Sequence, residues 1–132
     1  MIPPEHPLAE EPGNSIELGK IAEYDLIIPS RQSRLQEIGS WFASIDKKPV
    51  IRCRIAHMLN AYELTEQGLG IAIYPAAAGE IATKDAICIK KITNPSVTAS
   101  YVLIWKKNRQ LPRVAEEFLS YVKEIQAQEK EI

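Results

Sequence analysis

A run of hydrogen-bond donors at Ser30-Arg31-Gln32-Ser33 suggests the first chemistry in this sequence. The run follows an apolar stretch and precedes residues with helical periodicity, so free amides at a helix start would meet the serine hydroxyls there. Such donors bind carboxylates, and Arg31 or Arg34 could add a bidentate guanidinium partner. A simpler interpretation stays open, in which the serines only cap the helix and the arginines are solvated.

Two further positions carry groups that could contact a ligand. His57 lies where an apolar stretch passes into a predicted helix, and an imidazole there can hydrogen-bond a ligand or titrate near neutral pH. A surface histidine at a helix start is the competing interpretation. Tyr74 and Pro75 end another apolar stretch, where they would shape a cleft wall or only pack.

Catalytic and metal-binding motifs are missing from the sequence. It contains no G-x-S-x-G elbow, no H-E-x-x-H pair and no Walker loop. The segment 68–70 is too short for a dinucleotide fingerprint and stands between a helix and a strand in the reverse order. His6 and His57 are isolated from Cys53 and Cys88, and two buried thiols are favoured over a disulfide. We therefore predict no enzyme, no cofactor and no metal.

The elements that must position these residues alternate between strands and helices. Short apolar runs bounded by proline or glycine predict buried strands, and apolar residues at helical spacing predict helices. The predicted strands are 25–29, 50–55, 69–75, 85–92 and 97–106. Three longer helices are predicted: one that starts at a Ser33 cap and ends before Lys47, one at 57–67, and one that starts at Pro112. A short helix at 17–24 and a possible turn of helix at 76–81 are predicted as well.

Local signatures define three helix ends. Ser33 and Gln36 offer a capping box. Gly68 can take the left-handed conformation that ends a helix, with Leu69 folding back on Leu64. Pro112 fits the first position of the last helix, and an apolar stripe follows it at Val114, Phe118, Val122 and Ile125.

Successive strand–helix units predict an α/β domain with a largely parallel sheet flanked by helices. Ligands of such sheets bind beyond the carboxyl ends of the strands, which here carry the loops 29–33, 56–58 and 74–77. We therefore expect a small-molecule site at Pro29, Ser30, Arg31, Gln32, Ser33, Ala56, His57, Met58, Tyr74 and Pro75.

The composition argues against several classes of partner. The 132 residues carry a net charge of -1, without the basic excess that neutralises phosphates, so the chain itself is not expected to bind nucleic acid. The start of the chain is proline-rich and lacks a signal peptide, and no apolar run approaches membrane-spanning length. These features predict a cytoplasmic protein without a membrane partner.

Four stretches in order resemble the effector-binding domain of LysR-type transcriptional regulators. They cover nearly the whole chain, and the third is the most specific. The stretches are His6-Pro7-Leu8-Ala9, Leu26-Ile27-Ile28-Pro29-Ser30, Gln67 to Pro75, and Trp105-Lys106-Lys107 with Leu111-Pro112 and Phe118-Leu119. The sequence departs from the family at Arg54 and His57, where an acidic residue and a small hydroxyl residue are common, and at Leu111, where a serine cap is common. Because of the differences at Arg54 and His57, the family's effector-binding contacts do not carry over directly to these two positions.

The resemblance implies the second lobe, with the closing segment, of a two-lobed sensor of the periplasmic-binding-protein-like type II fold. Residues 1–14 would be the hinge entry, 15–97 the lobe, and 98–132 a return hinge strand and terminal helix. Such a lobe would bind a small anionic effector, pair as a homodimer or higher oligomer, and act through a DNA-binding part that is absent from this sequence. Its absence would mean either that the chain was cut from a longer protein or that its start is misassigned. The alternatives are a lobe of a transporter's solute-binding protein and a small enzyme on this fold.

Overall fold

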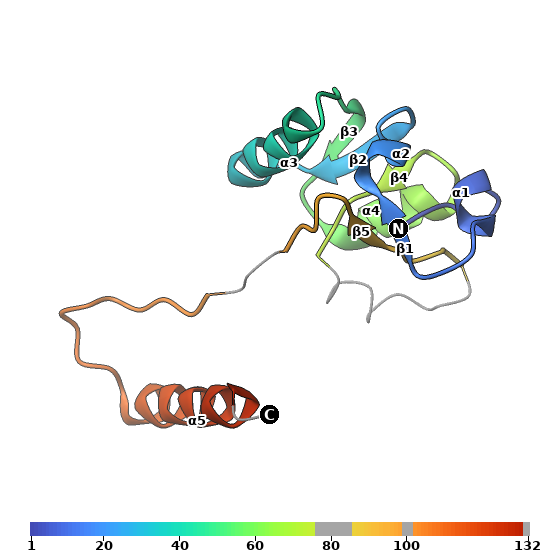
Figure 1. Ribbon diagram of the computed structural model, residues 1–132. Coiled ribbons are helices and arrows are strands. Elements are labelled where there is room, and N and C mark those ends of the chain that lie inside the picture. Colours follow the sequence, from blue (N-terminus) through green and yellow to red (C-terminus); the bar gives the residue numbers. More distant parts are fainter. Residues whose placement is uncertain (76–85, 99–101, 131–132) are drawn as a thin grey trace. The chain divides into compact units, whose positions relative to one another are not determined.

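The computed structural model describes residues 1–75, 86–98 and 102–130 (Figure 1). The chain forms two compact units, Met1–Ala99 and Ser100–Ile132. The predicted turn of helix at 76–81 lies outside the described residues. Among the helices of the described ranges, none is long and apolar enough to cross a membrane.

A parallel sheet with the strand order β3–β2–β4 forms the centre of the first unit. Its strands and the helices that connect them are β2 (Asp25–Pro29), α3 (Gln32–Ser44), β3 (Val50–Ile55), α4 (Met58–Glu66) and β4 (Ile71–Ala72). The middle strand β2 is the predicted apolar run, and Leu26, Ile27 and Ile28 in it are at most 1% exposed. Parallel strands joined through helices confirm the predicted α/β fold class.

The side chains of β2 alternate between two separate cores, because successive residues of a strand face opposite sides of the sheet. Leu26 and Ile28 pack in one core with Phe42 of α3, whereas Ile27 packs in the other with Ala61 of α4. The two helices therefore cover opposite faces of the sheet.

A second sheet joins the start of the chain to the residues near position 90. Its strands β1 (Ser15–Glu17) and β5 (Lys91–Thr93) are parallel, and the short helices α1 (Pro7–Glu10) and α2 (Leu18–Ile21) flank β1 in sequence. The backbone of Met1 exchanges two hydrogen bonds with Ala72, of 2.8 and 2.9 Å, and Ile2 forms an antiparallel bridge with Cys88. Residues 1–2 therefore extend the central sheet beyond β4.

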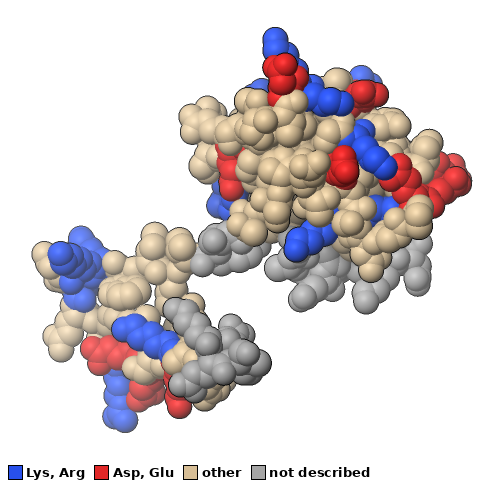
Figure 2. Space-filling model, viewed as in Figure 1, with Lys and Arg blue, Asp and Glu red and all other residues tan. Residues whose placement is uncertain are grey.

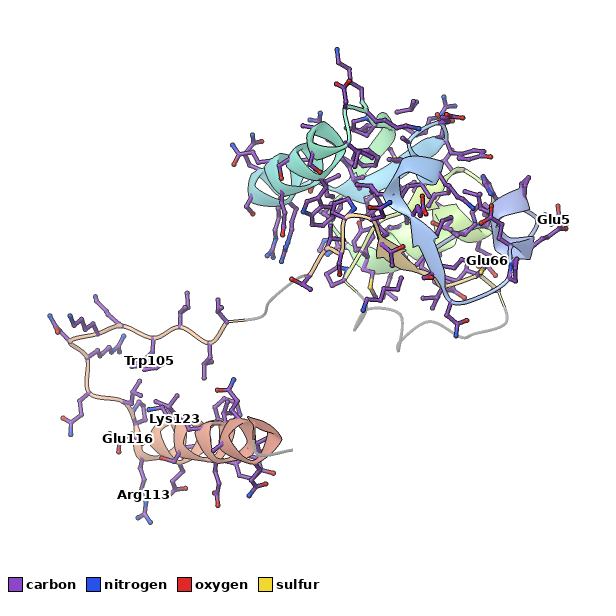
Figure 3. The ribbon with its side chains drawn as sticks, in the orientation of Figure 1. Glu5, Glu66, Trp105, Arg113, Glu116 and Lys123 are labelled. Atoms are coloured by element: carbon purple, nitrogen blue, oxygen red, sulfur yellow. The ribbon has the colours of Figure 1, made fainter. Side chains whose placement is uncertain are left out.

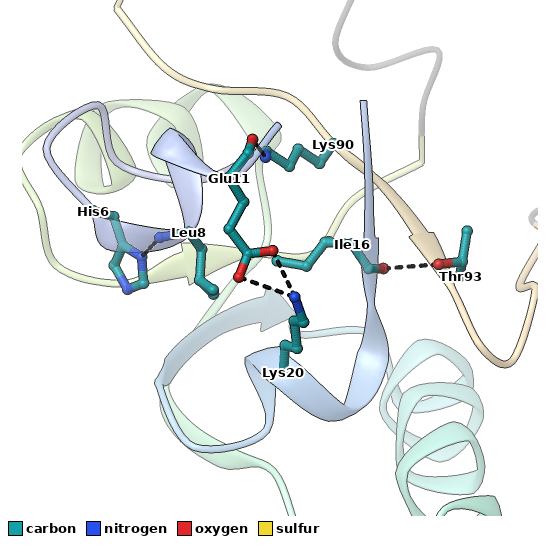
Figure 4. A network of polar contacts seen from close by, with 7 residues as sticks. All are labelled: His6, Leu8, Glu11, Ile16, Lys20, Lys90 and Thr93. Atoms are coloured by element: carbon teal, nitrogen blue, oxygen red, sulfur yellow. Dashed lines mark hydrogen bonds and ion pairs between the residues drawn. The ribbon is translucent and has the colours of Figure 1, made fainter. Parts of the chain in front are cut away.

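Polar contacts hold the loop after α1 against β5 and α2 (Figure 4). The Lys20 ammonium lies 2.7 and 3.0 Å from the two carboxylate oxygens of Glu11, and this hydrogen bond raises the pKa of Lys20. The ammonium group of the buried Lys90 donates to the Glu11 carbonyl oxygen, and the Thr93 hydroxyl donates to the carbonyl of Ile16 at 3.3 Å. Exposed ion pairs contribute little, so the buried Lys90 contact is the stronger tie.

His6 caps α1 through its ring. Its Nδ1 atom accepts a hydrogen bond from the Leu8 amide at 3.1 Å, and the ring lies edge-on to Tyr24 with centroids 4.5 Å apart. Desolvation lowers the pKa of His6 from its ordinary value of 6.5. Since only the neutral ring can accept this bond, the contribution of the cap is present above pH 6.5 and is lost as the pH falls through the lower folded-state pKa.

We expect the parent protein to lose about 1 kcal/mol more unfolding free energy than His6→Asn between about pH 7 and pH 5, because asparagine keeps the cap without titrating. Urea denaturation over this range measures the difference. The Met1 amino group, whose pKa burial lowers to about 6, adds a loss of stability in the same direction to both proteins, so the comparison isolates His6. Equal pH dependence in the two proteins would contradict the prediction.

The carboxyl end of α4 confirms the predicted cap. Gly68 has a φ of 78°, its amide donates to the Thr65 carbonyl at 3.0 Å, and the Leu69 amide donates to the Leu64 carbonyl at 2.9 Å. This is the hydrogen-bond pattern of a Schellman motif. Leu64 and Leu69 both pack against the core around Ala61, so the cap also adds apolar contact.

The start of α3 shows that the predicted capping box was wrong. Arg31 is the N-cap residue, no side chain makes a cap hydrogen bond, and Gln32 is the first helical residue. Ser33 is thus the second residue inside the helix, where its hydroxyl cannot take the N-cap role. The carbonyl of Arg31 accepts the amides of Arg34 and Leu35 at 3.0 Å each, which moves the helix start to before the serine.

Two elements are shorter than predicted. The strand expected at 69–75 is regular only at Ile71–Ala72, although the Ile73 amide still donates to the Ile27 carbonyl at 3.0 Å. The helix expected at 17–24 is reduced to Leu18–Ile21, because Glu17 belongs to β1.

The last two predicted strands also differ in the structure. In place of a strand at 85–92, the described residues have the bridge at Cys88 and then β5. Residues 102–106, expected to lie in a strand at 97–106, are not in one. Their composition favours a strand, but a strand also needs a hydrogen-bonding neighbour, and residues 102–105 are between 49% and 83% exposed.

The second unit contains the helix α5 (Arg113–Lys130). The Pro112 carbonyl accepts the amides of Ala115 and Glu116 at 2.9 and 3.1 Å, so Pro112 precedes the helix instead of occupying its first position. Before the helix, Trp105 faces α5, and the Lys123 ammonium lies 5.9 Å from its ring centroid (Figure 3). Most of the predicted apolar stripe on α5 is exposed.

Candidate functional site

The carboxyl ends of β2 and β3 bring two of the predicted loops to the same edge of the sheet. Pro29 is paired with Ile55 in the strand register, and the Ser30 amide donates to the Ile55 carbonyl at 3.1 Å. Ala56 and His57 follow Ile55 directly. The loops that lead into α3 and α4 therefore start from neighbouring positions.

The third predicted loop reaches the same carbonyl group. The Tyr74 hydroxyl donates to the Ile55 carbonyl oxygen at 3.2 Å. Desolvation, with a smaller effect of the nearby Cys53, raises the pKa of Tyr74, so its hydroxyl stays neutral and remains a donor at physiological pH. The Ile55 carbonyl is thus the point where all three loops meet, and the sequence could not indicate it because every residue has a carbonyl.

The two helices that start at this edge both lack a side-chain cap. Arg31 and His57 are the N-cap residues of α3 and α4, and each has an extended backbone without a cap hydrogen bond. The first amides of a helix have no partner inside the helix, and the helix dipole makes this end electropositive. Uncapped helix starts of this kind favour carboxylate and phosphate groups.

All ten residues of the predicted site are described, and none of them is buried. The exposed members are Ser30, Arg31, Gln32, Ser33, Ala56 and His57, and the half-buried members are Pro29, Met58, Tyr74 and Pro75. Leu59, in the first turn of α4, is 62% exposed beside these residues and was not among those predicted from the sequence. The predicted helix start at His57 could have indicated Leu59, because residues in the same first turn of a helix lie close to its start.

The two arginines proposed from the sequence differ in their ion pairs. Arg34 forms an ion pair with Glu37 at 2.5 Å within α3. Arg31 makes no ion pair with any residue that the structure describes. The Arg52 guanidinium lies 4.0 Å from the Asp25 carboxylate, so it points toward the opposite, amino end of these strands. Of the two arginines proposed from the sequence, Arg31 is therefore the better partner for an anion.

Metal binding has no support in the described ranges, where no group of three or more histidine, cysteine, aspartate or glutamate residues could hold an ion. Cys53 and Cys88 are free and half-buried thiols. The donors at the sheet edge are amides, hydroxyls and a guanidinium group, which suit an anion and not a cation.

Comparisons with known proteins agree with this architecture. The chain is similar in fold to HinK, a LysR family transcriptional regulator from Pseudomonas aeruginosa, with a TM-score of 0.62 and 20% sequence identity over 93% of this chain and 42% of HinK. The chain thus spans less than half the length of that protein. No curated protein sequence matches it. The family model of the LysR substrate binding domain matches residues 1–127, and the chain therefore belongs to the LysR substrate-binding domain family.

Proposed function

We propose that this chain is the effector-sensing lobe of a LysR-type transcriptional regulator and that the sheet-edge loops bind a small anionic metabolite. The observation that carries the proposal is the meeting of the three loops at the Ile55 carbonyl, next to the uncapped starts of α3 and α4. Arg31 would pair with the anionic group, and the hydroxyl groups of Ser30 and Ser33 would add donors. Met58 and Tyr74 would contact the body of the ligand.

The rest of the regulator's action would depend on other parts of a longer protein. Residues 1–14 would enter from the hinge, residues 15–97 would form the lobe, and residues 98–132 would return through the hinge. Transcription would be controlled through a DNA-binding domain outside the matched residues, in a cytoplasmic oligomer. On the face drawn in Figure 2, lysine and arginine side chains are interspersed with acidic ones, which supports a role without DNA contact for this chain.

The family match favours this function over the two alternatives. The matching family model is that of the LysR substrate binding domain. A solute-binding protein of a transporter would share the type of fold but would belong to a different family. An enzyme would need a nucleophile with an adjacent base or a comparable set of groups. The sheet edge instead offers donors suited to holding an anion, so binding without turnover is the proposed role.

Arg31→Ala is expected to weaken the binding of succinate at least about tenfold, because a hydrogen bond to a charged group contributes about 1.5–3 kcal/mol. Ser33→Ala should weaken it less, by about threefold to tenfold. Isothermal titration calorimetry with succinate, and with inorganic phosphate as a second anion, measures both effects. Thermal melting of each variant shows whether the fold is kept.

Arg52→Ala is the matched control, because this arginine lies at the opposite end of the strands. It should bind succinate like the parent protein. If Arg31→Ala and Ser33→Ala also bind like the parent, the loop is only a helix start with solvated arginines, and the proposed site is wrong. Equal weakening by Arg31→Ala and Arg52→Ala would instead indicate a nonspecific effect of net charge.

A further inference from the structure

We propose that the sheet-edge site selects monocarboxylates with an apolar body, because the apolar side chains of Met58 and Leu59 lie directly beside its anion donors. The inference rests on the proposed function, since it concerns the ligand of that same site, and it names the class of effector. This class has a single carboxylate group attached to an alkyl or aryl body, in contrast to a dicarboxylate.

The first turn of α4 presents apolar surface that the fold does not use. Leu59 is largely exposed and Met58 is half-buried. Neither side chain belongs to the two cores that the described residues form, whereas Ala61 and Thr65 are the buried residues of this helix. A single exposed leucine is ordinary on a protein surface. Apolar side chains next to a few polar donors, however, are the composition of a ligand site.

Met58 and Leu59 also supply backbone donors to the anion. They follow the N-cap residue His57, and the first amide of the helix that bonds back to the His57 carbonyl is that of Ala61, at 3.4 Å. The Cα–Cβ bonds of an α-helix tilt toward its amino end, so the side chains of the first turn extend toward the end where the free amides point. A carboxylate held by these amides therefore places its carbon chain next to Met58 and Leu59.

Tyr74 adds an aromatic ring to this edge of the sheet. Its hydroxyl donates to the Ile55 carbonyl at 3.2 Å, two residues before His57. The half-buried ring packs against the core around Ala61, which α4 covers. Because the hydroxyl proton is engaged with Ile55, the part of Tyr74 that remains for a ligand is chiefly carbon.

The charges around the first turn of α4 favour one carboxylate over two. Arg31 makes no ion pair with any described residue, whereas Arg34 is paired with Glu37. Glu63 is exposed one helical turn beyond Leu59, on the same face of α4. A second carboxylate at the far end of a ligand that lies along Leu59 would approach this like charge. An apolar end meets no such repulsion.

Arg54, a further cation near this edge, faces the other side of the sheet. Its neighbours in β3, Cys53 and Ile55, pack against the core around Ala61 of α4. Because successive residues of a strand face opposite sides of the sheet, Arg54 lies on the side that α3 covers. It therefore provides no counter-charge for a second carboxylate beside Leu59.

The test compares carboxylates of increasing chain length on the intact chain. Acetate, butyrate, hexanoate and succinate are each titrated, and the NMR shifts of the amides at residues 57–59 follow binding. Hexanoate should bind at least about tenfold more tightly than acetate, since each fully buried methylene group tightens binding up to about fourfold and the chain is only partly enclosed here. Butyrate, which differs from succinate only in having a methyl group in place of the second carboxylate, should bind at least about threefold more tightly than succinate.

Substitutions to glutamine locate the apolar contact. Leu59→Gln removes the apolar side chain and keeps a good helix former. It should reduce the ratio of hexanoate affinity to acetate affinity to below about threefold, and Met58→Gln should act in the same direction. Val50→Gln is the control, because Val50 is an exposed apolar residue at the opposite end of the strands. It should keep the affinity ratio of the parent.

Failure of this inference can be told apart from failure of the proposed function. If none of the carboxylates gives saturating shifts at residues 57–59, the proposed site is wrong and this inference falls with it. Carboxylate binding that does not depend on chain length, or tighter binding of succinate than of butyrate, would overturn the inference and leave the anion site in place. A dependence on chain length that both Leu59→Gln and Met58→Gln retain would also overturn it, since the apolar contact would then lie elsewhere.

Discussion

Replacing Phe42 with alanine is expected to lower the unfolding free energy of the first unit by about 3–5 kcal/mol. Phe42 is fully buried between α3 and the sheet, in the core with Leu26 and Ile28. Alanine would remove most of the apolar surface and leave a cavity that the strand and helix cannot close. Because small domains have a total stability of about 5–15 kcal/mol, this change should remove a large share of it.

Phe118→Ala is the matched control, since the chain has 2 phenylalanines and this one is 56% exposed. It should change the unfolding free energy of the first unit by less than about 0.5 kcal/mol. Urea denaturation followed by Trp41 fluorescence measures both, in a Trp105→Phe background so that the signal comes from α3 alone. A loss below about 1 kcal/mol for Phe42→Ala would contradict the packing of α3 on β2.

Gly70→Ala is expected to destabilise the first unit by about 3 kcal/mol or more, at the upper end of overpacking effects. An ideal Cβ at this position would lie 2.4 Å from the Asp25 carbonyl oxygen and 3.1 Å from its carbonyl carbon. These are backbone atoms of β2, so relief of the clash would require β4 to move away from the middle strand. Thermal melting of the variant measures the effect.

Gly39→Ala is the control for the second prediction, because an ideal Cβ at this position would meet no described atom within 4 Å apart from its chain neighbours and the backbone of its own helix. Gly39 is inside α3, where alanine is favoured over glycine by about 0.5–1 kcal/mol. The same chemical change should therefore stabilise the protein at position 39 and destabilise it at position 70. Equal melting temperatures for Gly70→Ala and the parent would show that β2 and β4 do not approach so closely.

The sequence was sufficient to predict the elements whose stability depends on local signals. The apolar run of β2 indicated a strand buried on both faces, and Gly68 with Leu69 indicated the end of α4. The strand predicted at 97–106 was wrong because residues 102–106 lack the neighbouring strand that the pattern alone cannot supply. The capping box at Ser33 was wrong because the N-cap position depends on backbone conformation, and Arg31 adopts the extended conformation.

The sequence could predict which loops lie together at one edge of the sheet, but not the contacts between them. The rule that ligands bind beyond the carboxyl ends of parallel strands selected the three loops. Their common contact at the Ile55 carbonyl depends on the register of β2 and β3 and on the direction of the Tyr74 side chain. The choice of Arg31 over Arg34 likewise depends on the ion pair between Arg34 and Glu37. The spacing of these two residues on the helix permits this ion pair but does not require it.

The most direct test of the central claim is a titration of the isotope-labelled chain with succinate, followed by the NMR shifts of its backbone amides. If the sheet edge binds small anions, the largest shifts should occur at residues 30–33, 57–59 and 74, and they should saturate together with one dissociation constant. The amides of Asp25 and Val50, which are paired at the opposite end of the strands, should stay unchanged. Saturating shifts that occur only away from the three loops, or no saturating shift at them with any of succinate, acetate and phosphate, would contradict the account.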